Sequence, residues 1–382
     1  MAAGKPALFL LDGNSLLYRS YYAIRGLASP TGFPTNAIYG FLLTLRKLVA
    51  EEQPGYLGVV FDLKGPTVRH KLDDRYKAGR KPMPDDLQLQ VPVLKDVLRA
   101  HNIPLFEYPE YEADDILGTL VKKASARGLP SVIVSTDKDL LQLVNDDVRV
   151  YNPSKEILLD AAAVEEALGV KPGQVVDLLS LSGDASDNVA GVRGVGEKTA
   201  KDLLRDFGSL ENLLNNIHRV KNPRLQKILT QGKEAAEHSR KLVTIETGLD
   251  IALDPEALRL GPPDGEQLAS LFRELGFSSF LEDAGAGLEE IDLDVRLILE
   301  EDALRGLVRE VGKRGFVSVD TETDGYQPTR ARLVGMSFCF EPGTAFYLPL
   351  GHKTPDSPPQ LPKEKALGLL RGVLGDPAVK KI

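Results

Sequence analysis

The chain has 382 residues, of which 42% are hydrophobic, and it carries a formal net charge of −8 at pH 7. Single hydrophobic cores stop growing at roughly 250–300 residues, so this length predicts two or more domains. The net charge argues against a protein that coats nucleic acid without specificity, and the single cysteine, Cys339, excludes an intramolecular disulfide and a thiolate zinc cluster. We therefore expect a cytoplasmic protein that does not bind membranes.

The first part of the chain alternates short apolar runs with longer amphipathic ones. This alternation predicts an α/β domain with a largely parallel, covered sheet, and we assign residues 1–161 to it. The first apolar run is far too short to span a bilayer and is expected to be a buried strand. The expected strands are residues 7–11, 56–61 and 131–135, and the expected helices are residues 36–52, 87–101 and 113–127.

The rest of the chain divides into a helical part and a second strand-rich part. From residue 162 to 281 the strand signal fades and helical patterns take over, which predicts a helical subdomain packed on the sheet. Residues 282–293 are small, acidic and nearly free of aromatic side chains, as is typical of an interdomain linker. Residues 294–382 form the second α/β domain, with strands expected at 315–320, 332–340 and 345–350.

Aspartates stand where the strands of the first domain end. Asp12 and Asp62 follow the first two strands, and Asp137 follows the third, with Asp139 two residues beyond. Ligands bind in the crevice outside the carboxyl ends of parallel strands, so these acids are expected to converge there.

Two further acidic motifs lie in the first two thirds of the chain. YEADDIL places Glu112, Asp114 and Asp115 at the start of a helix, and LSGDASDN places Asp184 and Asp187 in a loop. Each acid taken singly is more often a turn residue or a helix N-cap. Taken together, so many anions are costly unless hard cations neutralise them, and oxygen ligands favour Mg²⁺ or Mn²⁺. The set predicts a metal site, with two ions expected.

A basic segment with one aromatic residue follows Asp62. Within residues 64–81, Lys77 and Arg80 are three apart, so in a helix they would share a face and could clamp a phosphate. Tyr76 could stack on a base. The alternative is a solvated helix with a buried tyrosine.

Three glycines, Gly191, Gly194 and Gly196, form a predicted tight turn that leads into a helix. Such a turn can offer N–H groups to a phosphate or carbonyl groups to a monovalent cation such as K⁺. A plain packing joint between two helices is the alternative. The helices that follow contain a candidate surface for duplex DNA, or a merely solvated face, made by Arg219, Lys221, Arg224, Lys227 and Lys233.

Six ordered motifs in residues 7–285 resemble the 5'-nuclease domain of bacterial DNA polymerase I, which is akin to flap endonucleases. They are LDGNSLLYRSYYA, VVFDLKGPTVRH, RYKAGRKPMPDDL, YEADDILGTL, VSTDKDLLQLV and LSGDASDNVAGVRGVGEKTA. The resemblance implies a PIN-like fold in which the nine acids form the metal cluster, and a helical arch that contains Tyr76, Lys77 and Arg80. It also implies that residues 191–200, with Lys198 and Thr199, are a helix-hairpin-helix that contacts duplex DNA. Ala190 and Arg193 depart from the family pattern, which bears on the rigidity of the hairpin.

The second domain resembles the proofreading 3'-5' exonuclease of the same polymerases, of ribonuclease H-like fold. Asp320 and Glu322 in FVSVDTETDG lie on alternate strand positions and so point the same way, and MSFCFEPGTAFYLPLGH follows as a hairpin. The remaining exonuclease motifs and the polymerase domain are expected beyond Ile382, so we expect an incomplete exonuclease site.

The hypothesis from the sequence is metal-dependent hydrolysis of DNA at a 5' flap, nick or gap by a monomer associated with the nucleoid. Lys77 and Arg80 would neutralise charge on the phosphate, and changing Asp115 to Asn is expected to abolish cleavage. The alternatives are a non-catalytic module that binds DNA of a particular structure and a ribonuclease of the PIN type.

Overall fold

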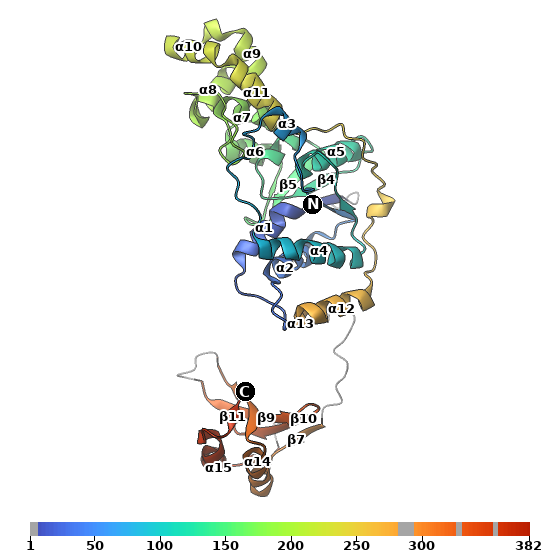
Figure 1. Ribbon diagram of the computed structural model, residues 1–382, viewed down its shortest axis with the longest axis vertical. Coiled ribbons are helices and arrows are strands. Elements are labelled where there is room, and N and C mark those ends of the chain that lie inside the picture. The colour runs from blue at the N-terminus through green and yellow to red at the C-terminus, as the bar shows by residue number, and fades with distance from the viewer. Residues whose placement is uncertain (1–6, 282–293, 326–330, 354–357) are drawn as a thin grey trace. The chain divides into compact units, whose positions relative to one another are not determined.

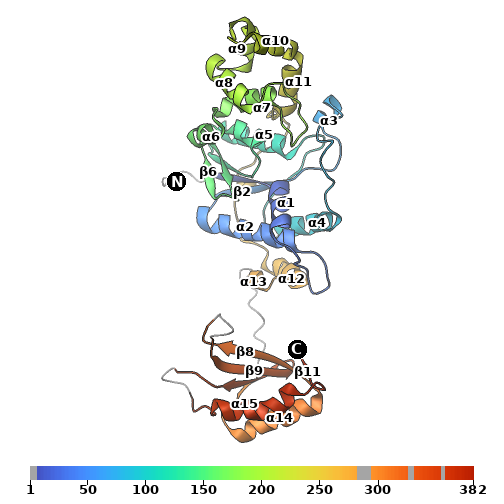
Figure 2. The same ribbon diagram turned by 90° about the vertical axis from the view of Figure 1, so that its left-hand side faces the viewer.

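The computed structural model describes residues 7–281, 294–325, 331–353 and 358–382, and the expected linker, residues 282–293, lies outside them. The chain forms two compact units, Met1–Ala286 and Gly287–Ile382 (Figures 1 and 2). Among the described residues, no helix combines the length and the apolar character needed to cross a bilayer.

The first unit is built on a six-stranded sheet with the order β3-β2-β1-β4-β5-β6. All neighbouring strands are parallel except β5 and β6, so the predicted parallel α/β domain is confirmed. The predicted strands become β1, β2 and β4, whereas the short β3 and the β5–β6 pair were not predicted. The strands are β1 (Leu8–Asp12), β2 (Tyr56–Val60), β3 (Leu105–Phe106), β4 (Ser131–Val134), β5 (Val148–Asn152) and β6 (Ile157–Leu159).

Helices cover both faces of this sheet because successive side chains of a strand point to opposite faces. In β1, Leu8 and Leu10 enter one core, which continues into the helical part, whereas Phe9 and Leu11 enter the other core. The helices that precede the helical part are α1 (Gly13–Ala23), α2 (Asn36–Glu52), α3 (Val68–Leu72), α4 (Asp85–Ala100), α5 (Ala113–Ser125) and the short 3₁₀ helix η1 (Asp139–Leu143).

The helical part packs beyond one face of the sheet, in the upper half of Figure 1. It does not comprise the whole of residues 162–281, because α12 and α13 return to the opposite core beside α2 and α4. Its helices are α6 (Ala161–Leu168), η2 (Pro172–Gln174), α7 (Val175–Ser182), α8 (Glu197–Phe207), α9 (Leu210–Asn215), η3 (Ile217–Arg219), α10 (Pro223–Gln231) and α11 (Lys233–Val243), followed by η4 (Glu256–Leu258), α12 (Gly265–Leu275) and α13 (Ser278–Leu281).

The second unit has a five-stranded sheet of order β11-β8-β9-β10-β7, and its own core. β9 pairs antiparallel with β8 and with β10, which confirms the predicted hairpin. Its elements are β7 (Asp294–Leu297), α14 (Glu301–Arg314), β8 (Phe316–Thr323), β9 (Leu333–Glu341), β10 (Thr344–Pro349), α15 (Lys363–Gly375) and β11 (Lys380–Lys381).

Candidate metal centre

Asp12 is fixed at the point where β1 becomes α1. It is the last residue of the strand and the N-cap of the helix, and its Oδ1 accepts a hydrogen bond from Ser15 N at 3.0 Å. Its Oδ2 accepts a hydrogen bond from Ser135 Oγ at 2.7 Å, and that same Oγ accepts one from Asp137 N at 3.0 Å. The ends of β1 and β4 are therefore held together through one serine hydroxyl.

Asp62 follows β2 and contacts the start of α5. Its Oδ1 accepts a hydrogen bond from Ala113 N at 2.7 Å, and its Oδ2 accepts one from Asn14 Nδ2 at 2.7 Å. The N-terminal N–H groups of a helix carry partial positive charge, so they favour acids at this place. The contact brings the end of β2 next to Glu112 and Asp114 at the start of α5.

The ends of these elements surround one cleft of about 460 Å³. Five of the predicted acids line it, namely Asp12, Asp62, Glu112, Asp114 and Asp137. The cleft is also lined by aromatic and cationic side chains, among them Tyr18, Tyr22, Lys77, Arg80 and Lys138. The expected convergence of acids from separate strands is thus present in the structure.

Burial makes ionisation of two acids in the cleft unfavourable. Burial raises the pKa of Asp12 to about 7, although hydrogen bonds from Ser15 and Ser135 partly oppose the shift. Burial, together with the charges of Asp137 and Asp12, raises the pKa of Asp114 well above its ordinary value. Such shifts mean that the ionised cluster is costly in the protein alone. A divalent cation with oxygen ligands would relieve that cost.

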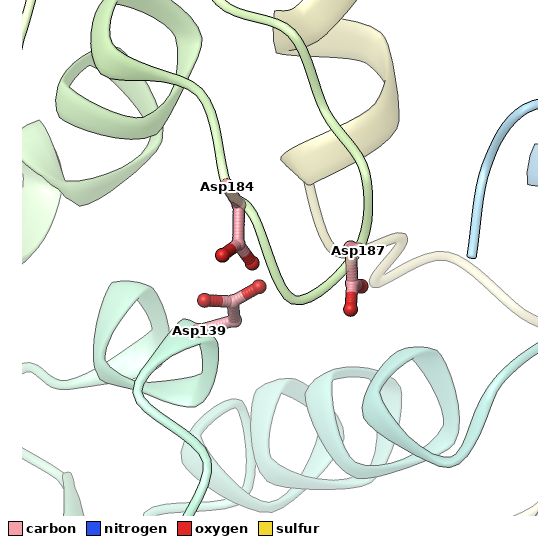
Figure 3. A group of neighbouring side chains, drawn as sticks. All are labelled: Asp139, Asp184 and Asp187. Carbon is pink, nitrogen blue, oxygen red and sulfur yellow. The ribbon is translucent and has the colours of Figure 1, made fainter. Parts of the chain in front are cut away.

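A second group of acids lies beside the cleft and consists of Asp139, Asp184 and Asp187. One carboxylate oxygen from each lies within 4.8 Å of the others, and Figure 3 shows Asp139 and Asp184 facing one another with Asp187 to one side. Asp139 begins η1, whereas the other two lie in the loop after α7. Sequence positions 45 or more apart are thereby brought to one place.

The chemistry of this second group fits a hard cation. Asp139 Oδ1 is buried without a hydrogen-bond partner among the described residues, and unpaired buried polar atoms are rare. Burial, then the charges of Asp137 and Asp184, raises the pKa of Asp139 to about 7. For Asp184 burial opposes ionisation, but hydrogen bonds from Ser186 and the charge of Lys138 outweigh it and lower the pKa.

Asp115 differs from the other predicted acids because it faces the protein interior. It is fully buried, and Arg69 Nη1 and Nη2 donate to its two oxygens at 2.7 Å each. Each oxygen also accepts a backbone hydrogen bond, from Glu112 N at 3.1 Å and from Glu246 N at 2.8 Å. With both oxygens occupied in this way, the geometry argues against the expected roles of Asp115 as a metal ligand and catalytic acid.

Arg69 is a site residue that the sequence reasoning missed, because it was counted only as part of a basic segment. Its side chain is buried, and beyond Asp115 it donates to Leu242 O and Thr244 O at 2.8 Å each. The pair of Arg69 and Asp115 therefore ties the start of α5 to the segment that follows α11. Its sequence neighbours, Val68, His70 and Lys71, give no signal that this arginine is the one that the fold encloses.

Tyr76 is also placed differently from the expectation. Only 4% of the residue is exposed, and its hydroxyl donates to Glu112 Oε2 at 3.0 Å and to Asp187 Oδ2 at 2.8 Å. The expected stacking of its ring on a base is therefore wrong for this conformation, and the alternative of a buried tyrosine holds. Tyr76 instead links the two groups of acids.

Lys77 and Arg80 face the acids, but they do not share a helix. Residues 74–79 form turns, and Lys77 has a positive φ of 56°, which a helix does not allow. Lys77 Nζ lies 2.9 Å from Glu112 Oε1 and 3.5 Å from Asp187 Oδ2, while Arg80 Nη2 lies 2.5 Å from Asp187 Oδ1. The predicted helix is wrong, yet both cations line the cleft.

The glycine-rich turn joins α7 to α8 as predicted. Gly191 has a φ of 62°, and a Cβ there would lie 2.2 Å from Gly183 N, so only glycine fits. Gly194, Gly196 and Lys198 are exposed at the start of α8, and Thr199 is half-buried. The helix-hairpin-helix thus presents backbone N–H groups and a lysine to solvent.

The acids of the second unit lie on one strand. Asp320 and Glu322 are both exposed on β8, where their register partners on β9 are Ser337 and Gly335. Their side chains share a face, as expected from the alternation along a strand.

Three family models match the chain in order. The N-terminal resolvase-like domain of 5'-3' exonucleases matches residues 7–169, the C-terminal SAM fold of 5'-3' exonucleases matches residues 170–266, and a 3'-5' exonuclease matches residues 295–382. Among solved structures, T5 5'-exonuclease with bound zinc has a TM-score of 0.55 at 20% identity and covers 73% of this chain and 98% of its own. The catalytic core of Rad2 in complex with DNA has a TM-score of 0.52 at 17% identity, over 73% and 91%. These likenesses show the shared fold.

Several relatives are more similar to this chain in sequence than these solved structures are. A 5'-3' exonuclease of Aquifex aeolicus is 44% identical over 278 residues, which is 72% of this chain and 94% of that protein. DNA polymerase I of Bacillus caldotenax is 38% identical over 349 residues, and that of Pseudomonas aeruginosa is 37% identical over 396 residues. These matches cover 90% and 98% of this chain, which spans about two fifths of either polymerase. The chain therefore belongs to the 5'-3' exonuclease family of bacterial DNA polymerase I, and a 3'-5' exonuclease domain follows its 5'-nuclease region.

Proposed function

We propose that this chain is a metal-dependent 5'-nuclease that hydrolyses phosphodiester bonds of DNA at 5' flaps, nicks or gaps. The observation that carries the proposal is the cleft at the strand ends, where five acids meet cationic side chains that include Lys77 and Arg80. We further propose that the chain acts as a monomer in the cytoplasm, associated with the nucleoid.

Two groups of acids would hold the divalent cations, Mg²⁺ or Mn²⁺. The group in the cleft is Asp12, Asp62, Glu112, Asp114 and Asp137, and the group beside it is Asp139, Asp184 and Asp187. When bound, two such cations would supply Lewis-acid stabilisation of the reacting phosphate and activate water for in-line displacement. Asp115 is left out of both groups and acts by holding α5 through Arg69.

The cationic side chains of the cleft would bind the DNA backbone. Lys77 and Arg80 already lie next to carboxylates, so they are held at the wall where the scissile phosphate would enter. There they would neutralise charge that develops on the phosphate. Tyr76, buried between the two groups of acids, would keep this segment in position.

The helix-hairpin-helix would bind the duplex next to the cut. Its exposed backbone and Lys198 offer contacts to phosphates, and the carbonyl groups of its turn could hold K⁺. Contacts to phosphates carry no sequence information, so recognition would depend on the shape of the DNA.

The test is incubation of the full chain with a duplex that has a labelled 5' flap, with Mg²⁺ present or chelated. We expect cleavage near the flap junction in Mg²⁺ and none with the chelator. Asp12→Asn should abolish cleavage, and it should leave binding of the DNA in the chelator largely intact. Glu256→Gln, at an exposed ion pair outside the cleft, is the matched control and should cleave as the unaltered chain does.

Two results would favour the alternatives. Tight binding of the flap without cleavage in Mg²⁺ or Mn²⁺ would indicate a non-catalytic module that binds DNA of a particular structure. Faster cleavage of single-stranded RNA than of the flap would indicate a ribonuclease of the PIN type.

A further inference from the structure

Helix α11 contacts both the glycine-rich turn of the helix-hairpin-helix and residues 73–80, the segment that carries two cationic side chains of the cleft. Its Ser239 is buried, and Ser239 Oγ accepts a hydrogen bond from Gly191 N at 3.1 Å. Its His238, one residue earlier, has Nε2 at 2.9 Å from Oδ2 of Asp73, which directly follows α3; α3 lies beside α11 in Figure 1. Two adjacent residues of one helix thus join the turn to the segment.

Asp73 organises the start of segment 73–80. Its Oδ1 accepts hydrogen bonds from Arg75 N at 2.9 Å and Arg75 Nε at 3.0 Å, and its Oδ2 accepts one from Arg75 Nη2 at 2.8 Å. Its carbonyl group accepts a hydrogen bond from Tyr76 N at 3.0 Å. Hydrogen bonds from Arg75 and from His238 lower the pKa of Asp73, so this carboxylate stays ionised. The position of Asp73 therefore determines where the turns of the segment begin.

The rest of the segment is held by the loop after α7. Lys77 N donates to Asp187 O at 3.0 Å, and Asn188 Nδ2 donates to Arg75 O at 2.7 Å. These bonds remain when the histidine of α11 is removed. Its loss would therefore displace the segment, with Lys77 and Arg80, without releasing it from the cleft.

We propose that His238 is a positioning residue that couples binding of duplex DNA at the glycine-rich turn to the placement of Lys77 and Arg80 in the cleft. The inference rests on the proposed function, since it assumes that the turn binds duplex and that both cations meet the scissile phosphate. A duplex bound at the turn fixes Ser239, and α11, as a rigid element, passes that position through His238 to Asp73. The two cations then reach their places only when a duplex lies next to the cut.

The experiment measures kcat and KM of the full chain on flap DNA in Mg²⁺, and the affinity for the same DNA in a chelator. A displacement of about 1 Å that arises far from the chemistry can cost about 100-fold in rate, and we expect His238→Ala to lower kcat about 10-fold. KM and the affinity should stay within about 2-fold, because the surfaces that bind the duplex are unchanged.

Two variants show whether the hydrogen bond itself matters. His238→Gln should recover most of kcat, because its amide group can donate to Asp73. Glu237→Ala, at an exposed position of the same helix, is the matched control and should cleave as the unaltered chain does. The His238 side chain is 38% exposed, so the loss of its pair with Asp73 should change the urea midpoint little. Urea midpoints of all variants verify that each is folded in the assay.

Two comparisons test the coupling. On a substrate with the same 5' end but no duplex beside it, the turn has nothing to bind, so His238→Ala should cleave at the same rate as the unaltered chain. The double variant of His238→Ala with Ser239→Ala should lose no more kcat than the larger of the two single losses, because both residues act in one path.

Four results would overturn the inference. They are an unchanged kcat of His238→Ala on flap DNA, an equal loss in His238→Gln, an equal loss on the substrate without a duplex, and single losses that multiply in the double variant. Failure of the unaltered chain to cleave flap DNA would instead reject the proposed function.

Discussion

Replacing Arg69 by methionine should destabilise the first unit strongly. The methionine roughly fills the space of the side-chain stem but removes the guanidinium, which donates to both oxygens of Asp115 and to the carbonyl groups of Leu242 and Thr244. The Arg69 side chain is 10% exposed and that of Asp115 is 0% exposed, so water cannot replace the lost donors.

The size of the effect follows from this burial. Breaking a buried ion pair by removing one partner costs about 3–5 kcal/mol, because the remaining charge is left uncompensated. With a urea m-value of about 2–3 kcal/mol per molar, the midpoint of unfolding should fall by at least about 1 M. Midpoints are the quantity to compare, since a chain with two compact units need not unfold in one step.

The assay is urea unfolding followed by far-ultraviolet circular dichroism, with Arg259→Met as the control. Arg259 forms an exposed pair with Glu256, at 2.8 Å, and exposed pairs contribute about 0–1 kcal/mol. The double variant with Asp115→Asn should lose less stability than the sum of the two single variants. The reasoning is wrong if Arg69→Met lowers the midpoint no more than Arg259→Met does.

Further predictions concern charge and backbone in the first unit. Without divalent cations, the melting temperature should fall as pH rises from about 4 to about 7. The reason is that Asp12 and Asp139, with folded pKa values of about 7, bind more protons in the folded than in the unfolded chain over that range. Mg²⁺ should raise the melting temperature more at pH 7.5 than at pH 5, and a melting temperature that does not depend on pH in the chelator would contradict this reasoning. Asp12→Asn should abolish cleavage yet raise the melting temperature of the metal-free chain at pH 7.5, because removing a charge that is buried and lies near Asp62 and Asp137 is worth on the order of 1 kcal/mol. A lower melting temperature would show that the hydrogen bonds Asp12 accepts from Ser15 and Ser135 outweigh the cost of burying the charge. Gly191→Ala should lower the free energy of unfolding by more than about 2 kcal/mol, because of the strained φ and the contact with Gly183. Gly261→Ala, with open space around the added Cβ, should change the free energy of unfolding by no more than about 0.5 kcal/mol. Urea midpoints measure both.

The sequence determined the layout of the first unit because its signals are local. Runs of apolar residues of strand length, alternating with amphipathic stretches of helix length, predict the strands and helices that the structure has at β1, β2, β4, α2 and α5. Aspartates at the ends of parallel strands have only one edge of the sheet to occupy, so the meeting of Asp12, Asp62 and Asp137 could be foreseen.

The tertiary structure decided which of the neighbouring charged and aromatic side chains face the cleft. Asp114 and Asp115 are adjacent in sequence, but successive residues of a helix point about 100° apart, so one lines the cleft and the other is buried against Arg69. Likewise, Tyr76 is enclosed by acids that come from α5 and from the loop after α7, whereas Tyr22 remains exposed. Enclosure depends on contacts between residues far apart in the chain, which no local pattern of residues encodes.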